Sequence, residues 1–110
     1  MASEYGYRLT RGADADLDDI IRYIAVDLSN KTAATHFMDL FQEAVNDIRS
    51  FPEMGPTMIN GFIANTRTRK KPVGNYVIYY IPDHEENLIL VLRILHSKRN
   101  LDEMIHELDI

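Results

Sequence analysis

The sequence contains no cysteine. A chain without cysteine forms no disulfide framework and offers no thiol nucleophile or thiolate metal ligand, which fits a reducing compartment. Long hydrophobic runs are also missing. The longest apolar stretch, residues 88–95, is interrupted by Arg93, and residues 1–10 hold no apolar signal-peptide core. These absences predict a cytoplasmic protein without a membrane span.

No internal repeat, low-complexity segment or linker divides the chain. It has 110 residues, of which 45% are hydrophobic and 26% are charged. This composition buries enough apolar surface to offset the entropy of ordering, and the length suits one hydrophobic core. We therefore expect residues 1–110 to form a single globular domain, too small for a large cofactor enzyme.

Charge is unevenly distributed along the chain, whose formal net charge is −5. Residues 1–60 carry a net charge of −5, residues 61–99 of +4, and residues 100–110 of −4. The basic segment is able to bind a polyanion, or it is an ordinary strand pair with solvated Lys and Arg side chains. The acidic flanks weaken long-range attraction to nucleic acid, which argues against free RNA or DNA as the main partner.

The first half of the sequence predicts a strand followed by two helices. Apolar residues alternate in 5–9, the period of a half-buried strand. Thr10 is suited to cap a helix whose apolar residues recur every three to four positions up to Leu28. Residues 29–30 break this helix, and a second amphipathic helix continues until Pro52.

Turn signals and β-branched residues then predict a three-stranded antiparallel meander. In residues 51–56, two prolines exclude a continuing helix and Gly55 tolerates a positive φ angle. Strands are expected at 62–71, 75–81 and 88–95, with turns at 72–74 and 82–87. Apolar spacing at 101–108 suits a final short helix. The predicted fold class is α+β: one N-terminal strand, a two-helix antiparallel hairpin, and a meander whose inner face the hairpin covers.

Several short pieces of the chain match a known pattern in order and spacing. They are residues 7–10, the helix pattern Ala13, Asp16, Leu17, Ile20 and Tyr23, residues 51–52 with Gly55, residues 72–80, and residues 92–96 followed by Lys98 and Arg99. Together they resemble the ParE/RelE superfamily of toxins from bacterial type II toxin-antitoxin pairs, over nearly the whole chain. The ending from Arg93 to Arg99 is more similar to the ParE branch than to the RelE branch.

The resemblance implies a toxin that is neutralised by a cognate antitoxin protein in a hetero-oligomer, as part of a plasmid-stabilisation module. ParE-like members inhibit DNA gyrase, whereas RelE-like members cut ribosome-bound messenger RNA. A third alternative is a homologue that has lost toxicity and retains antitoxin binding. The acidic net charge is consistent with this alternative, because toxins of the superfamily are generally more basic. None of these functions needs a cofactor.

A metal-independent nuclease needs cations around the scissile phosphate, with an acid and a base. Arg93 and His96 are the catalytic candidates under this alternative, with further cations on the preceding strands. Histidine is the usual side chain for proton transfer near neutral pH, which makes His96 the acid/base candidate. However, no tyrosine follows His96, although RelE-like nucleases carry a tyrosine or a further basic residue there. A non-enzymatic binding inhibitor is therefore the leading hypothesis.

The groove beside the helical hairpin and the basic edge of the meander are expected to bind an apolar and acidic antitoxin tail. The candidate residues for binding antitoxin or target are Arg67, Arg69, Lys70, Lys71, Arg93, His96, Lys98 and Arg99.

Each candidate also has a purely structural interpretation. Arg93, in a strand of Leu, Ile and Val, is as well explained by pairing with Asp16 or Asp19 of the first helix. His96 at a strand end is more often a surface or capping residue. The aspartates of the first helix turns are explained by the helix dipole. The remaining histidines lack ligand spacing, so no metal site is expected.

The tyrosines of the central meander strand are expected to pack rather than to bind. They are able to stack on bases, but aromatic side chains in half-buried strands are usually core residues. Tyr76, Ile78 and Tyr80 share one face of this strand by alternation, and Tyr79 lies on the other. In the stretch after the second helix, Met54 and Met58 are adaptable enough to contact a partner.

Overall fold

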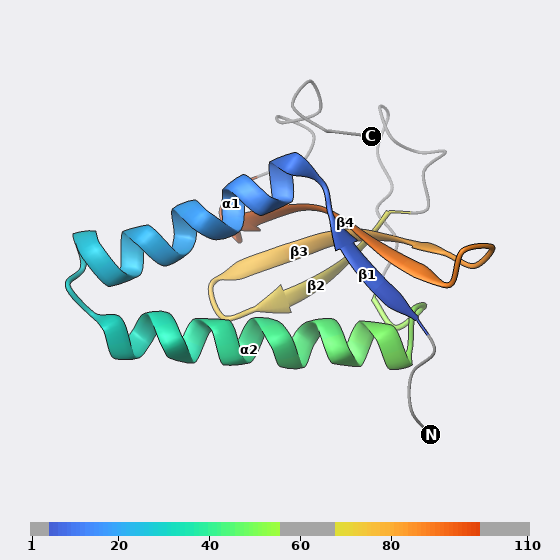
Figure 1. The fold of residues 1–110 in the computed structure, drawn as a ribbon, viewed down its shortest axis with the longest axis horizontal. Helices are drawn as coiled ribbons and strands as arrows, with labels where there is room; N and C mark the ends of the chain where they lie inside the picture. The colour runs from blue at the N-terminus through green and yellow to red at the C-terminus, as the bar shows by residue number, and fades with distance from the viewer. Residues whose placement is uncertain (1–4, 56–67, 100–110) are drawn as a thin grey trace.

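The computed structural model describes residues 5–55 and 68–99. Figure 1 shows their arrangement, in which the two helices form a V beside a four-stranded sheet. The elements are β1 (Gly6–Leu9), α1 (Arg11–Arg22), the π-helical turn η1 (Tyr23–Asp27), α2 (Lys31–Ser50), β2 (Arg69–Val73), β3 (Tyr76–Asp83) and β4 (Leu88–His96).

The sheet has the order β1-β4-β3-β2. β2, β3 and β4 form the predicted antiparallel meander, and β1 pairs parallel to β4 at the far edge. In the sequence, the helical hairpin lies between β1 and β2. It returns the chain to the sheet, where β1 and β4 run in the same direction. The α+β class is confirmed.

The helices begin and end at the residues that the sequence indicated. The Thr10 side chain accepts a hydrogen bond from Ala13 N at 3.1 Å, and the Asn30 side chain accepts one from Ala33 N at 2.9 Å. Ser29 adopts a φ of 49°, which separates the two helices. The last turn of the first helix widens into η1, where Leu28 N donates to Tyr23 O at 3.0 Å. Among the described residues, no helix is long and apolar enough to cross a membrane.

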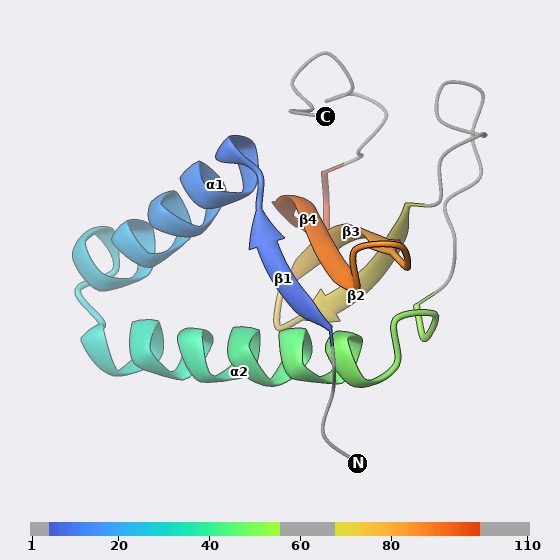
Figure 2. The ribbon, with the colours of Figure 1, turned by 45° about the vertical axis from the view of Figure 1, so that its right-hand side comes forward.

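The helices lie against one face of the sheet (Figures 1 and 2), and the main core is packed between them and that face. α2 contributes most of the helical side chains, among them Phe37, Phe41 and Ile48. Ile78 and Tyr80 of β3 belong to this core, and Tyr76 packs against it. The predicted alternation along this strand is therefore confirmed, and Tyr79 on the opposite face is also buried.

The predicted turn at 72–74 was wrong. β2 continues through Pro72, which lies opposite Val77, and through Val73. Proline is tolerated here because β2 is an edge strand, so the missing N–H interrupts no ladder. Only Gly74, with a φ of 57°, and Asn75 connect β2 to β3.

Three other predictions have shifted boundaries or lie wholly or partly outside the described residues. β3 extends through Pro82 and Asp83, which pair with β4, so the turn expected at 82–87 is shorter. Within the strand expected at 62–71, β2 begins at Arg69. Residues 62–67 lie outside the described ranges. The helix expected at 101–108 also lies outside them.

Gly55 has a different role from the predicted one, because Gly74 alone among the described glycines has a positive φ. Gly55 packs directly on β2 and β3. A Cβ atom at this position would collide with the backbone oxygen of Lys70 and would lie 2.8 Å from the Tyr80 hydroxyl. Its backbone N–H donates to that hydroxyl at 3.2 Å. Glycine is needed here for close approach.

Candidate functional site

Arg93, a candidate for catalysis, lies on β4 in a buried ion pair with Asp16 of α1. Its Nε donates to Asp16 Oδ2 at 2.7 Å, and a second guanidinium nitrogen donates to Oδ1 at 2.9 Å. The two side chains are only 8% and 14% exposed. The bidentate geometry satisfies both charges where water is scarce. Of the two acidic partners considered from the sequence, the structure shows Asp16.

The same carboxylate also covers an open edge of β4. β1 pairs with β4 only as far as Val91. Beyond it, the Thr10 hydroxyl donates to Leu92 O at 2.7 Å, and Ile94 N donates to Asp16 Oδ2 at 2.9 Å. A bulge in the β3–β4 register at Tyr79/Tyr80 accompanies this change of partner. Asp16 and Thr10 therefore attach α1 to β4 where no strand continues the sheet.

His96, at the end of β4, is half-buried against Tyr76. The two rings are 5.3 Å apart, edge to face. His96 Nδ1 accepts a hydrogen bond from Lys98 N at 3.2 Å, so this nitrogen caps the turn that follows β4. The pKa of the Tyr76 hydroxyl is raised, first by burial and then by the charge of Tyr23. Tyr76 therefore stays protonated beside His96 at neutral pH.

Tyr76 and His96 lie between two adjoining hollows along the first helix and η1. The larger, of about 410 Å³, is mainly apolar and is lined by Tyr23, Ile24, Leu28, Ala33, Asn75, Tyr76 and His96. The smaller, of about 170 Å³, is lined by Asp16, Asp19, Ile20, Tyr76, Ile94, Leu95, His96 and Arg99. We call the two together the α1 groove. It has an apolar end at η1 and a charged end at Asp16, Asp19 and Arg99.

Apolar side chains at the η1 end of the α1 groove remain exposed. Tyr23 and Leu28 expose 48% and 54% of their surface, and Val26 on the same turn exposes 65%. π-helical turns occur often at functional sites, because they break the regular helix and redirect side chains. Exposed apolar residues beside an apolar hollow are typical of a surface that binds another protein.

The cations of β2 lie elsewhere and are engaged by acidic residues. Arg69 donates to the backbone oxygens of Glu53 and Gly55 and forms an ion pair with the Glu53 carboxylate at 2.6 Å. Lys71 lies 3.8 Å from Asp47 of α2. Lys70 between them is exposed. These contacts fix β2 to α2 and to the turn after it.

The predicted cations therefore form two groups instead of one. Arg69 lies opposite Tyr80 and His96 opposite Tyr76, so the two are roughly 13 Å apart along the strand direction at about 3.3 Å per residue. Lys98 and the groove residue Arg99 are exposed and belong to the His96 group. Arg67 lies outside the described residues. Among the residues that are described, no three acidic or histidine side chains are placed to hold a metal ion.

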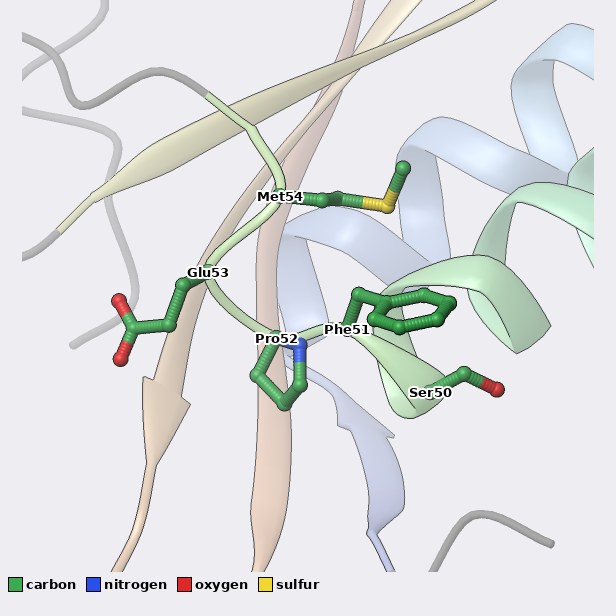
Figure 3. Close-up of a pocket in the computed structure, with 5 residues that line it drawn as sticks. All are labelled: Ser50, Phe51, Pro52, Glu53 and Met54. Carbon is green, nitrogen blue, oxygen red and sulfur yellow. The ribbon is translucent and has the colours of Figure 1, made fainter. Parts of the chain in front are cut away.

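Sequence reasoning missed three features of this surface. It used Ile24 and Leu28 for helical spacing and Tyr23 for the family pattern, although all three line the α1 groove. It also missed a chain of polar contacts through His84, which joins segments that are distant in sequence. The third is an apolar surface pocket in the turn after α2. There Phe51 and Met54 project to the same side of the turn and Glu53 to the other (Figure 3). In the sequence, only the flexible side chain of Met54 indicated that this turn is able to contact a partner.

Comparisons with known proteins agree on the architecture. Residues 7–101 match the family model described as the ParE toxin of the type II toxin-antitoxin system parDE. The chain is similar to the toxin-antitoxin complex RelBE2 of Mycobacterium tuberculosis, with 24% identity and a TM-score of 0.57, covering 87% of this chain and 93% of that one. It is also similar to the chromosomal ParDE toxin-antitoxin system of P. aeruginosa, with 20% identity and a TM-score of 0.64, covering 84% and 95%. No curated protein matches the chain.

Proposed function

Since this chain belongs to the ParE toxin family of type II toxin-antitoxin systems, we propose that it arrests growth by binding DNA gyrase or a related type II topoisomerase. It does so without a catalytic step of its own. A cognate antitoxin neutralises it, and the pair acts in the cytoplasm as a plasmid-stabilisation module. Membership of the family confirms the resemblance found in the sequence.

The pairing of Arg93 with Asp16 is the observation that favours a binding inhibitor over a nuclease. A metal-independent nuclease stabilises the developing phosphate charge with cations that are free to contact it. For Arg93 to do so, a phosphate would have to displace a buried carboxylate that also holds the N–H of Ile94. The cost of leaving that carboxylate unpaired is several kcal/mol, roughly 3–5 by analogy with broken buried pairs.

A RelE-like endoribonuclease acting on ribosome-bound messenger RNA is the second candidate. The observation in its favour is that His96 and Arg99 line the same hollow, which places a proton carrier beside a cation. Against it, Arg69 is engaged by Glu53 and lies roughly 13 Å from His96 along the strands, at about 3.3 Å per residue. A homologue that only binds antitoxin is the remaining alternative.

We assign the antitoxin to the α1 groove. The exposed groove residues Tyr23 and Leu28 suit an apolar anchor side chain, and the exposed Lys98 beside the groove suits an acidic residue of a tail. The cations Arg69 and Lys71 are less suited to this role than the sequence suggested, because each already faces a carboxylate. Lys70 remains an exposed cation on the edge strand.

The target is tested by inducing the chain without its antitoxin in a bacterial host. DNA synthesis and protein synthesis are pulse-labelled in the same culture over the first minutes. We expect DNA synthesis to stop first, followed by inhibition of purified gyrase in a supercoiling assay. Earlier loss of protein synthesis would instead establish the nuclease. Continued synthesis of both, with folded protein present, would leave only the antitoxin-binding homologue.

The antitoxin surface is tested with a matched pair of charge insertions at exposed apolar residues. Leu28→Glu puts a carboxylate into the apolar hollow, and we expect it to weaken binding to the product of the neighbouring antitoxin gene by about tenfold or more. Met38→Glu is the control, because Met38 is an exposed apolar residue of α2 that does not line the groove. Equal affinities of the two variants would exclude the α1 groove as the antitoxin site.

A further inference from the structure

A chain of polar side chains at the end of the sheet opposite the α1–α2 connection has no role in the proposed toxin function. Tyr5 Oη lies 2.6 Å from His84 Nδ1, and His84 Nε2 lies 2.7 Å from Glu53 Oε1. The other oxygen of Glu53 pairs with Arg69 at 2.6 Å. Figure 2 shows that the start of β1, the β3–β4 turn and the end of α2 lie at this end of the molecule.

The direction of the hydrogen bonds follows from the chemistry of each group. An ionised carboxylate only accepts, so Nε2 of the imidazole carries a proton that it donates to Glu53. The other nitrogen of a neutral imidazole is then an acceptor, and the Tyr5 hydroxyl donates to it. A hydroxyl that donates to an imidazole, itself oriented by a carboxylate, is the arrangement that activates a nucleophile by general-base assistance.

The contact between Tyr5 and His84 is not needed to hold this part of the backbone. Arg49 Nε donates to Tyr5 O at 2.6 Å, and Gly6 N donates to Asn87 O at 2.9 Å. The His84 side chain is about half exposed, so a small molecule reaches the Tyr5–His84 pair from solvent. The Tyr5–His84–Glu53 contacts therefore have the geometry of a reactive site, and they also link three segments of the chain.

From this geometry we propose that Tyr5 is an activated tyrosine, a modification site that accepts an acyl group from an activated ester. In the step, Tyr5 Oη attacks the carbonyl carbon and a new O–C bond forms. The hydroxyl proton passes to His84 Nδ1, and the bond to the leaving group breaks with its electron pair on the departing oxygen. The products are O-acyl-Tyr5 and the leaving-group anion, and His84 then returns its proton to water. The proposal is independent of the toxin function.

The test uses the full chain and p-nitrophenyl acetate as the probe, with the acetylated peptides quantified by mass spectrometry. Tyr7 is the internal control, because it is 39% exposed on the adjoining strand β1. We expect Tyr5 to be acetylated at least about tenfold faster than Tyr7, a modest share of what a positioned general base contributes. In His84→Gln this advantage should disappear. Equal rates in the native chain, or an undiminished rate in the variant, would overturn the proposal.

A second measurement does not depend on the folding of any variant. In concentrated urea the native chain loses the contact between Tyr5 and His84, so the two tyrosines should be acetylated at nearly the same rate. If the preference for Tyr5 persists in urea, it arises from the local sequence and the proposal fails. Growth arrest is not read in either experiment, so failure here leaves the proposed function untouched.

Discussion

The carboxylate of Asp16 accepts two hydrogen bonds from the guanidinium of Arg93, across the junction between α1 and β4. The same carboxylate accepts the backbone N–H of Ile94. Three donors from one strand thus converge on one residue of a helix distant in sequence. A substitution of Arg93 would therefore disturb folding and any catalysis together, and does not separate the two functions.

Removing the charge of Asp16 should strongly destabilise the fold. We expect Asp16→Asn to lower the free energy of unfolding by about 3–5 kcal/mol, because the largely buried guanidinium of Arg93 then faces a neutral amide in place of the Asp16 carboxylate. Asp19→Asn, at an exposed position on the same helix, is the control and should change it by less than about 0.5 kcal/mol. Urea unfolding followed by circular dichroism measures both. Similar midpoints for the two variants would show that the Arg93–Asp16 pair contributes little.

His96 offers a cleaner test of catalysis than Arg93. In His96→Asn, the side-chain oxygen is able to replace Nδ1 as the acceptor for Lys98 N–H, while the proton-transfer group is lost. If the protein is a binding inhibitor, growth arrest on induction should be retained at nearly the native level. A loss of arrest by a hundredfold or more in surviving cells, with the variant folded and unchanged in stability, would support the nuclease.

Gly55→Ala should destabilise the protein by about 1–3 kcal/mol, because the added methyl group collides with the Lys70 carbonyl and crowds the Tyr80 hydroxyl. Gly6→Ala is the matched control. Its nearest neighbour would be Leu88 Cδ1 at 3.8 Å, an ordinary contact, so little change is expected. Thermal unfolding of the two variants provides the comparison. A stable Gly55→Ala protein would mean that the turn after α2 shifts freely from the sheet.

Stability should fall at alkaline pH because of buried tyrosines. Burial raises the pKa of Tyr80 above its ordinary value of 10.0, although the Gly55 N–H and Arg69 oppose this. Above about pH 10 the unfolded chain then releases the proton while the folded chain retains it, so the free energy of unfolding decreases as pH rises. Burial raises the pKa of Tyr76 and Tyr79 in the same direction.

Tyr80→Phe isolates the contribution of Tyr80. At pH 7 the variant should be less stable by about 1–2 kcal/mol, because the buried Gly55 N–H loses its acceptor. Between pH 9.5 and 11, its stability should fall less steeply than that of the native chain. Urea titrations at several pH values measure both effects, with exposed Tyr7→Phe as the control. Parallel slopes for Tyr80→Phe and the native chain would contradict the assignment to Tyr80.

The sequence by itself determined the order of the elements and the ends of the helices. Thr10 and Asn30 cap because their side chains reach the N–H groups three residues later, an interaction within one turn. The alternation in β3 places Ile78 and Tyr80 on the helix face by the two-residue period of a strand. Helix caps and strand alternation depend on residues close together in the chain. They can therefore be predicted from the sequence without knowing which other element packs against them.

The tertiary structure decided everything that depends on which distant segments meet. Two aspartates were suitable partners for Arg93, and only the packing of α1 on β4 selects Asp16. The basic residues form one segment in sequence, yet the strand register places Arg69 and His96 roughly 13 Å apart along the strands, at about 3.3 Å per residue. Pro72 and Gly55 carry turn signals, but Pro72 lies on an edge strand and Gly55 against a backbone carbonyl. The contact between Tyr5 and His84 joins residues 79 positions apart, and no local period encodes such a distance.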